Sequence, residues 1–279
     1  MRGRRACAVL RGPRCSNAPG LPGARRRPRR GRGHPAARRQ REHRPLPCSG
    51  RQLNALGQRL ADGTSSDAGH ALFAQVADAY QAVLDHVGRR LRELGFEATT
   101  RVKTTGTLLD KLRRDPTLKL RSIHDLAGAR IVIDGTLDDQ DAAKARVIDA
   151  FASCPRPPVE KDRRKTPSHG YRAVHVIVFP ENMPVEIQIR TNLQNGWAQF
   201  TESLGDMWGR RLRYGAGPDD PDAPAGKAVA EGLTRAQVVE IWVSFSELTY
   251  DMERLDLDLS AARADCCGHS SPRRSDSGH

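Results

Sequence analysis

Charged and polar side chains recur in four short blocks of the sequence, in patterns that could bind and transfer phosphate groups. In the first block, Arg101 and Lys103 point to the same side of a predicted strand, and Thr107 and Lys111 follow on one face of a predicted helix. These four side chains can converge on one anionic object such as a triphosphate. A solvated charged face would show the same pattern, so the block by itself leaves both interpretations open.

Two carboxylates stand where they could bind a metal ion or accept a proton. Asp125 precedes a predicted buried strand, where an acid can hold Mg²⁺ through its oxygen atoms, although a turn or cap acid would occupy the same place. Glu186, Gln188 and Arg190 alternate with apolar residues, so one face of their strand carries an acid, an amide and a base. Burying such a polar row for structure alone is costly, which favours a functional face.

A tyrosine next to a flexible glycine could bind a nucleobase. Gly170, Tyr171 and Arg172 open a predicted strand that also carries His175, and a basic run at 163–165 precedes them. An aromatic ring with an arginine nearby is a suitable platform on which a purine can stack. A tyrosine in the core or at a sheet edge is the structural alternative.

Helices and strands must alternate to position these blocks. Apolar residues at steps of three and four predict helices over 72–94, 104–114 and 138–151, and shorter runs predict strands over 96–103, 129–133, 158–165, 172–179 and 184–190. The last two strands form a hairpin across 180–183. We therefore expect an α/β or α+β domain with a mixed sheet of about five strands flanked by helices.

Two further helices follow the last strand. Capping boxes that begin at Thr191 and Thr234 open predicted helices over 192–213 and 234–260. In the second of these helices, apolar residues from Val238 to Leu259 recur at steps of three and four, which is the spacing of a helix-packing seam. We expect this seam to dock on the first helix or on a partner subunit.

Charge divides the chain into a basic N-terminal segment and a nearly neutral remainder. Residues 1–50 contain fifteen arginines and one acid, Glu42, so their net charge is +14. The whole chain has a net charge of +13, which leaves about −1 for residues 51–279. We predict a disordered tail at 1–50, a catalytic domain at 51–262 and a second disordered tail at 263–279. Contact of this tail with RNA or a membrane surface is a second interpretation, RNA contact being possible only there, and translation from a downstream start is a third.

The sequence contains no apolar stretch of the roughly 20 residues that a membrane span requires, so we expect no membrane insertion and a cytoplasmic protein. Five of the six cysteines fall in the predicted tails, and only Cys154 lies in the body. Their spacing suits neither a structural disulfide framework nor a zinc site.

Taken in order, the blocks resemble the synthetase domain of the RelA/SpoT family. The matching motifs are Arg101-x-Lys103-x-x-x-Thr107-x-x-x-Lys111, Asp125-Leu-x-Gly-x-Arg130, Gly170-Tyr171-Arg172-x-x-His175 and Val185-Glu-Ile-Gln-Ile-Arg-Thr191. The resemblance covers roughly residues 70–215, and Trp197-Ala198 with the trailing helices is most similar to the short, single-domain alarmone synthetases. It implies a nucleotidyltransferase-like synthetase fold with N- and C-terminal helices.

The resemblance also implies an activity and a role for each block. The activity is Mg²⁺-dependent transfer of pyrophosphate from ATP to the 3′-hydroxyl of GDP or GTP, which makes guanosine tetra- or pentaphosphate. Asp125 and Glu186 are then the catalytic and metal-binding acids. ATP phosphates are bound by Arg101, Lys103, Thr107, Lys111 and Arg130. The acceptor nucleotide is bound by Lys165, Tyr171, Arg172, His175, Gln188 and Arg190.

Two departures from the family pattern keep other readings open. Pro167 stands where the family often has a lysine, and Lys165 could serve instead; the segment 197–204 lacks an expected histidine. The same donor-side residues would suit a toxin that transfers pyrophosphate to adenine nucleotides or tRNA 3′ ends, or a nucleotide- or RNA-binding relative without turnover. We expect no hydrolase or ribosome-binding domain, and a homo-oligomer through the terminal helices is compatible with the seam.

Overall fold

The computed structural model describes residues 46–268. The predicted tails over 1–45 and 269–279, and the RNA or membrane contact considered for the first, lie outside the described residues. The first helix begins at Gly50 with Ser49 as N-cap, Leu46 packs against the core, and the last helix continues to Gly268.

Helices and strands alternate as predicted from residue 72 onward, and a helix that was not predicted precedes them. The helices are α1 (Gly50–Ala61), α2 (Asp67–Glu93), α3 (Thr105–Arg114), α4 (Leu137–Ala150), α5 (Asn192–Trp208) and α6 (Arg235–Gly268), with 3-10 turns η1 (Leu120–Ser122), η2 (Pro180–Asn182) and η3 (Arg210–Tyr214). The strands are β1 (Ala98–Val102), β2 (Ala127–Ile133), β3 (Val159–Asp162), β4 (Val174–Val178) and β5 (Val185–Thr191). Over residues 46–268, no helix combines the length and apolar character needed to cross a membrane.

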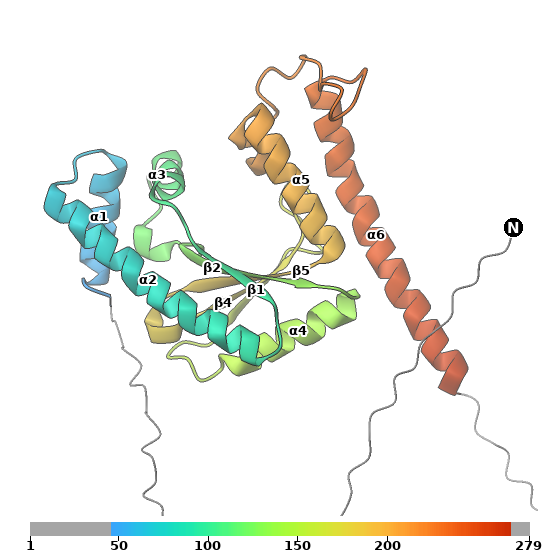
Figure 1. Cartoon of the computed structure of the whole chain (residues 1–279), viewed down its shortest axis with the longest axis horizontal. Helices are drawn as coiled ribbons and strands as arrows, with labels where there is room; N and C mark the ends of the chain where they lie inside the picture. Colours follow the sequence, from blue (N-terminus) through green and yellow to red (C-terminus); the bar gives the residue numbers. More distant parts are fainter. Residues whose placement is uncertain (1–45, 269–279) are drawn as a thin grey trace, which may run out of the picture. The chain divides into compact units, whose positions relative to one another are not determined.

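The five strands form one mixed sheet, as expected, and their order is β1-β2-β5-β4-β3 (Figure 1). β2 and β5 are parallel, and the other neighbouring pairs are antiparallel. Alternate residues such as Ala129, Ile187 and Val176 face the core, where α2 and α4 pack on them. The opposite face carries the polar residues of β2 and β5, and α3 and α5 lie on that side of the sheet (Figure 1).

The C-terminal helix α6 packs by apolar residues at its start, where Trp242 stacks on Trp197, and by polar residues further along. Ser246, Thr249 and Glu253 are buried, and Glu253 accepts hydrogen bonds from Thr191 and Gln194. α6 contacts α5 and α4, so the expectation that its seam docks on the first helix was wrong. The Ser246 hydroxyl and the Glu253 carboxylate form hydrogen bonds with buried polar groups of other elements. Buried polar groups need such partners, and this need outweighs the apolar spacing in deciding which face of α6 is buried.

The apolar seam of α6 is consequently exposed. Of the predicted seam only Val238 is buried, whereas Ile241 and Leu255 are 58% and 59% exposed. The other seam residues, Phe245, Leu248, Met252 and Leu259, are also exposed. A continuous row of large apolar side chains on a helix surface marks an interaction site.

Arg172 anchors α6 to the sheet. It is 7% exposed, donates from Nε to the carbonyl oxygen and hydroxyl of Ser246 at 3.3 and 3.2 Å, and lies with its guanidinium 4.4 Å from the centre of the Tyr250 ring. Its Nη1 also donates to the carbonyl oxygen of Arg164. Arg172 therefore joins the loop before β4 to the middle of α6.

We expect Arg172→Ala to lower the free energy of unfolding by about 2–4 kcal/mol, because it leaves buried carbonyl groups without a donor. The exposed Arg163, in the same loop, gives a matched control: Arg163→Ala should change stability by less than about 0.5 kcal/mol. Urea unfolding followed by circular dichroism measures both. Equal stability of the two variants would contradict the anchoring role.

Candidate active site

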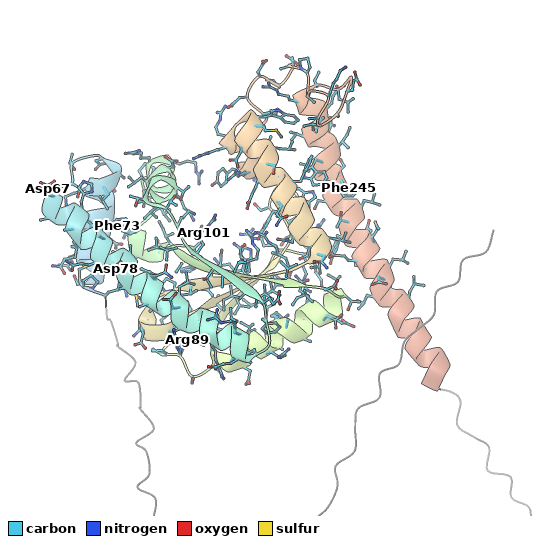
Figure 2. All side chains as sticks on the ribbon, in the orientation of Figure 1. Asp67, Phe73, Asp78, Arg89, Arg101 and Phe245 are labelled. Atoms are coloured by element: carbon cyan, nitrogen blue, oxygen red, sulfur yellow. The ribbon has the colours of Figure 1, made fainter. Side chains whose placement is uncertain are left out.

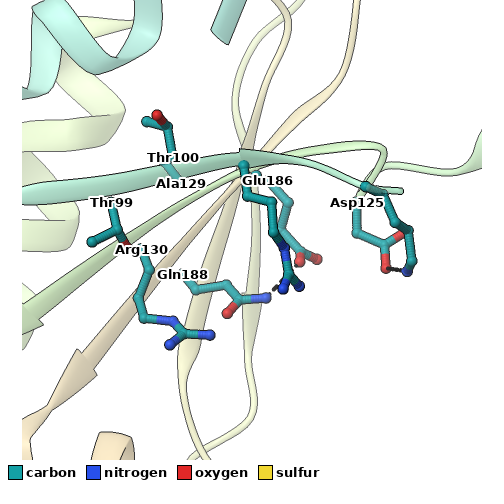
Figure 3. Close-up of a pocket in the computed structure, with 10 residues that line it drawn as sticks. Thr99, Thr100, Asp125, Ala129, Arg130, Glu186 and Gln188 are labelled. Atoms are coloured by element: carbon teal, nitrogen blue, oxygen red, sulfur yellow. Dashed lines mark hydrogen bonds and ion pairs between the residues drawn. The ribbon is translucent and has the colours of Figure 1, made fainter. Parts of the chain in front are cut away.

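A cleft of about 310 Å³ lies on the polar face of the sheet (Figure 3). Its walls come from the edge strand β1, the loop before β2, and strands β2 and β5. It is lined by Thr99, Thr100, Arg101, Lys103, Asp125, Gly128, Ala129, Arg130, Glu186 and Gln188. Strand register creates this grouping, since β1 pairs Arg101 with Gly128, and the parallel β2–β5 pair sets Gly128 beside Glu186 and Arg130 beside Gln188.

At one end of the cleft, Asp125 is held between two lysines. Its Oδ2 and Oδ1 each lie 2.8 Å from an ammonium nitrogen, that of Lys103 and that of Lys111 respectively. Burial alone would raise the pKa of Asp125, but the two lysines outweigh it and lower that pKa to about 2. The first and second sequence blocks thus meet, and Arg101 lies on the side of the sheet that faces α3 and α5 (Figure 2).

Glu186 belongs to a closed ring of hydrogen bonds. Its Oε1 lies 3.2 Å from His175 Nδ1, and its Oε2 accepts from Gln188 Nε2 at 2.9 Å. His175 Nε2 lies 2.9 Å from the Tyr171 hydroxyl, which accepts from Arg190 Nη2 at 3.0 Å. Arg190 Nη2 also donates to Gln188 Oε1 at 2.9 Å, which closes the ring.

The ring fixes the protonation pattern around Glu186. Burial alone would raise the pKa of Glu186, but the hydrogen bonds from His175 and Gln188 hold that pKa below its usual value. Burial raises the pKa of Tyr171, so its phenol keeps the hydrogen. Since Arg190 donates to the phenol oxygen, we assign the phenolic hydrogen to His175 Nε2 and the imidazole hydrogen to Nδ1, toward an ionised Glu186.

Tyr171 also borders a second cavity, a recess of about 110 Å³. The recess is lined by Ser168, His169, Tyr171, Trp197, Ala198, Thr201, Glu202 and Arg213. Gly170 has φ +82°, and a Cβ built on it would lie 2.6 Å from Cζ2 of Trp197. The approach of the loop to α5, which sets Tyr171 at the recess, therefore requires glycine.

The family model "Region found in RelA / SpoT proteins" matches residues 100–204, which include every motif of the cleft. The chain is also 37% identical over 204 residues to the uncharacterized protein Rv1366 of Mycobacterium tuberculosis, a match that covers 71% of each protein. The chain belongs to the RelA/SpoT family.

Solved structures of small alarmone synthetases are more distant in sequence. Small alarmone synthetase 1 from Bacillus subtilis, bound to its product pppGpp, is 24% identical and has a TM-score of 0.48; the match covers 67% of this chain and 94% of that one. Small alarmone synthetase 2 from the same organism is 21% identical, with a TM-score of 0.49, over 68% of this chain and 98% of that one.

Most of the site residues predicted from the RelA/SpoT motifs come together. Arg101, Lys103, Asp125, Arg130, Glu186 and Gln188 line the cleft, Lys111 reaches it through Asp125, and Tyr171, His175 and Arg190 are linked to Glu186 through the ring. Their catalytic and binding roles remain predictions.

Three predicted residues lie elsewhere. Thr107 is exposed on α3 and hydrogen-bonds to Thr104, and Lys165 is exposed in the loop after β3; neither lines the cleft or the recess. Arg172 is buried against α6 and lines neither cavity, so its role at the acceptor nucleotide stays a prediction. Spacing alone could not distinguish an arginine that faces the cleft from one that faces a distant helix.

Sequence reasoning missed several residues of both cavities. Thr99 lies two positions before Arg101 on β1, so strand alternation would have placed the two on one side. Glu202 and Arg213 border the recess, and they follow Thr191, the end of the last matched motif, by 11 and 22 residues. Their position depends on how α5 and η3 fold back over Tyr171, which no local pattern indicates.

The carboxylates of the cleft fit the Mg²⁺ expected of a RelA/SpoT synthetase. Asp125 and Glu186 line the same cleft, and carboxylate oxygens are the ligands that Mg²⁺ prefers. Among residues 46–259, whose side chains the structure describes, no three His, Cys, Asp or Glu side chains are grouped to hold a metal. The donor set suits an ion that keeps water and substrate phosphate oxygens as its remaining ligands.

The ion pairs of Asp125 make a pH-dependent contribution to stability. Its pKa is about 2 in the folded protein and about 3.9 in an unfolded chain, so the contribution is full above about pH 5 and is lost as the pH falls toward 2. We expect Asp125→Asn to lower the free energy of unfolding by roughly 2 kcal/mol near pH 6, and the difference from wild type to shrink below about pH 4.

Urea titrations between about pH 3 and pH 7 measure this difference. Asp78→Asn is the matched control, because Asp78 is exposed on α2. A difference between Asp125→Asn and wild type that stays constant down to pH 3 would contradict the ion-pair assignment.

Proposed function

We propose that this protein transfers the pyrophosphate group of ATP to the 3′-hydroxyl of GDP or GTP in the cytoplasm, releasing AMP. The observation that carries the proposal is a single cleft in which Arg101 and Lys103 stand near two carboxylates, Asp125 and Glu186. Membership of the RelA/SpoT family supports the reaction class.

The donor side of the cleft suits a triphosphate. Arg101 is exposed and lines the cleft, and Lys103 and Lys111 hold Asp125 in the free protein. When ATP binds, its phosphates take over the two lysines, and Asp125 becomes available to the metal ion. Mg²⁺ bound there with Glu186 would neutralise charge on the transferred group.

The reaction requires a hydroxyl held next to an acceptor of its proton. The acceptor's 3′-oxygen attacks the β-phosphorus of ATP, the bond from that phosphorus to the oxygen bridging the α-phosphorus breaks, and AMP leaves with the bonding electron pair. Glu186 accepts the hydrogen bond, and then the proton, of the 3′-hydroxyl. His175 and Gln188 each occupy one lone pair of the Glu186 carboxylate, so its second lone pairs can face the hydroxyl.

Tyr171 is the proposed platform for the acceptor base. Its ring lies edge-on to His175, with ring centres 5.6 Å apart, and its hydroxyl is fixed by Arg190. A base stacked on this ring would enter the recess, and its ribose would extend toward Glu186 through the same hydrogen-bonded ring of residues. Positioning of this kind accounts for a large part of the rate of bimolecular transfer.

The test offers GDP, GTP, ADP and deacylated tRNA separately to the protein with Mg²⁺ and ATP labelled in its β-phosphate. We expect label on GDP or GTP, and a loss of about 10²-fold or more in Glu186→Gln, because the variant lacks the proton acceptor. Glu97→Gln, at an exposed position before β1, is the matched control and should keep full activity.

Each other outcome excludes the proposal in a different way. Label on ADP or tRNA would assign the protein to the toxin class with the same donor side. No transfer to any acceptor, with ATP still bound, would favour a nucleotide-binding relative without turnover.

We also propose that the exposed seam of α6 joins copies of this chain. Phe245 and Leu248 are 41% and 54% exposed in the middle of the seam. Apolar area of this kind is stabilised by burial, and a second α6 offers a matching surface.

Phe245→Asp should reduce the particle mass measured by light scattering, since it places a charge in the seam. Ser244→Asp is the matched control, because Ser244 is exposed next to the seam. If the particle mass is the same in wild type and in both variants, the seam does not hold copies together, whatever that mass is.

A further inference from the structure

The recess beside Tyr171 contains a carboxylate that the proposed chemistry does not use. Glu202, on α5, lines the recess, and its side chain is 46% exposed. Its Oε1 lies 3.8 Å from Nη2 of Arg130, which is longer than a direct hydrogen bond. Within the described part of the chain, no hydrogen bond to its carboxylate accompanies this ion pair, so its oxygens can accept hydrogen bonds from a ligand.

We infer that Glu202 selects guanine as the acceptor base by accepting hydrogen bonds from the N1–H and 2-amino groups. This inference rests on the acceptor site of the proposed function. Guanine presents these two donors side by side, and a carboxylate presents two acceptors with the same spacing. Adenine has a lone pair at N1 and no 2-amino group, so it would set an acceptor against the carboxylate.

The surroundings of Glu202 support readout of a base edge. Tyr171 lines the same recess and offers a ring for stacking, and Ala198 leaves space beside it. Reading the Watson–Crick edge of a stacked base is a common way in which proteins recognise an unpaired nucleotide.

Arg213 supplies a complementary group next to Glu202 in the recess. Its Nη2 donates to the backbone carbonyl of Glu202 at 2.8 Å and also contacts Asp206. Its Nε is buried without a hydrogen-bond partner. A guanidinium at the recess is a donor that matches the O6 acceptor of guanine.

Glu202 could instead serve only to neutralise Arg130 of the donor cleft. The two roles predict different measurements. Neutralisation predicts that loss of the carboxylate changes the KM for ATP and leaves discrimination between bases unchanged. Base readout predicts that loss of the carboxylate leaves the KM for ATP unchanged and reduces discrimination between bases.

The experiment compares GDP with inosine diphosphate, which lacks only the 2-amino group, and with ADP. Calorimetry measures binding of each nucleotide to the full chain, and the labelled-ATP assay measures transfer to each. Wild type should bind GDP about 10- to 100-fold more tightly than inosine diphosphate, because the charged hydrogen bond to the 2-amino group is lost. Glu202→Gln should reduce this ratio to within about threefold, with the KM for ATP unchanged. Glu247→Gln, at an exposed position of α6, is the matched control and should keep the wild-type ratio.

The binding arm separates this inference from the proposed function. If GDP preference in binding disappears in Glu202→Gln but wild type transfers nothing, the readout stands and the reaction is wrong. If wild type transfers to GDP yet Glu202→Gln keeps the same preference, the reaction stands and the readout is wrong. Wild type that binds GDP and inosine diphosphate equally, or neither of them, overturns the inference.

Discussion

The carboxylate of Glu186 accepts hydrogen bonds from His175 and Gln188, and the ring closes through Tyr171 and Arg190. An ionised acid this deeply placed is costly unless such partners surround it. The ring spans β4, β5 and the loop before β4, and it forms because the antiparallel register pairs His175 with Gln188. A shift of one residue in that register would turn the whole polar row into the core. The pairing of β4 with β5 therefore also fixes the position of Glu186.

The two cavities share this constraint, because each is bordered by a member of the ring. Glu186 lines the cleft of the polar face, and Tyr171 lines the recess under α5. The helix α6 holds the loop that contains Tyr171. The Ser246 hydroxyl donates to the carbonyl of Gly170, and Arg172 donates to Ser246. A helix far along the sequence thus fixes the loop that presents Tyr171. Its exposed apolar seam lies on another side of that helix.

Much of the fold could be predicted because its signals are local. Period-two alternation identified β5, and period-three-and-four spacing identified α2 together with its end near Gly95. The seam of α6 shows where local reasoning fails. Its apolar spacing predicted docking by that face, but the buried face carries Ser246 and Glu253, whose partners lie on other elements. The need to hydrogen-bond buried polar groups decided the orientation of α6. These hydrogen bonds join residues that are far apart in the sequence, so local spacing does not reveal them.

The sequence by itself determined the family, the order of helices and strands, and several charged residues of the cleft, since these motif residues occupy positions that strand alternation sends to one face. Only the tertiary structure decided which cations face that cleft and which serve the fold. Arg101 and Arg172 are both arginines of matched motifs. Arg101 lines the cleft, whereas Arg172 is buried under α6. Likewise, Glu202 reaches the recess only because α5 packs against the loop of Gly170. Side-chain type and spacing fix what a residue can do, whereas its neighbours are set by packing between distant segments.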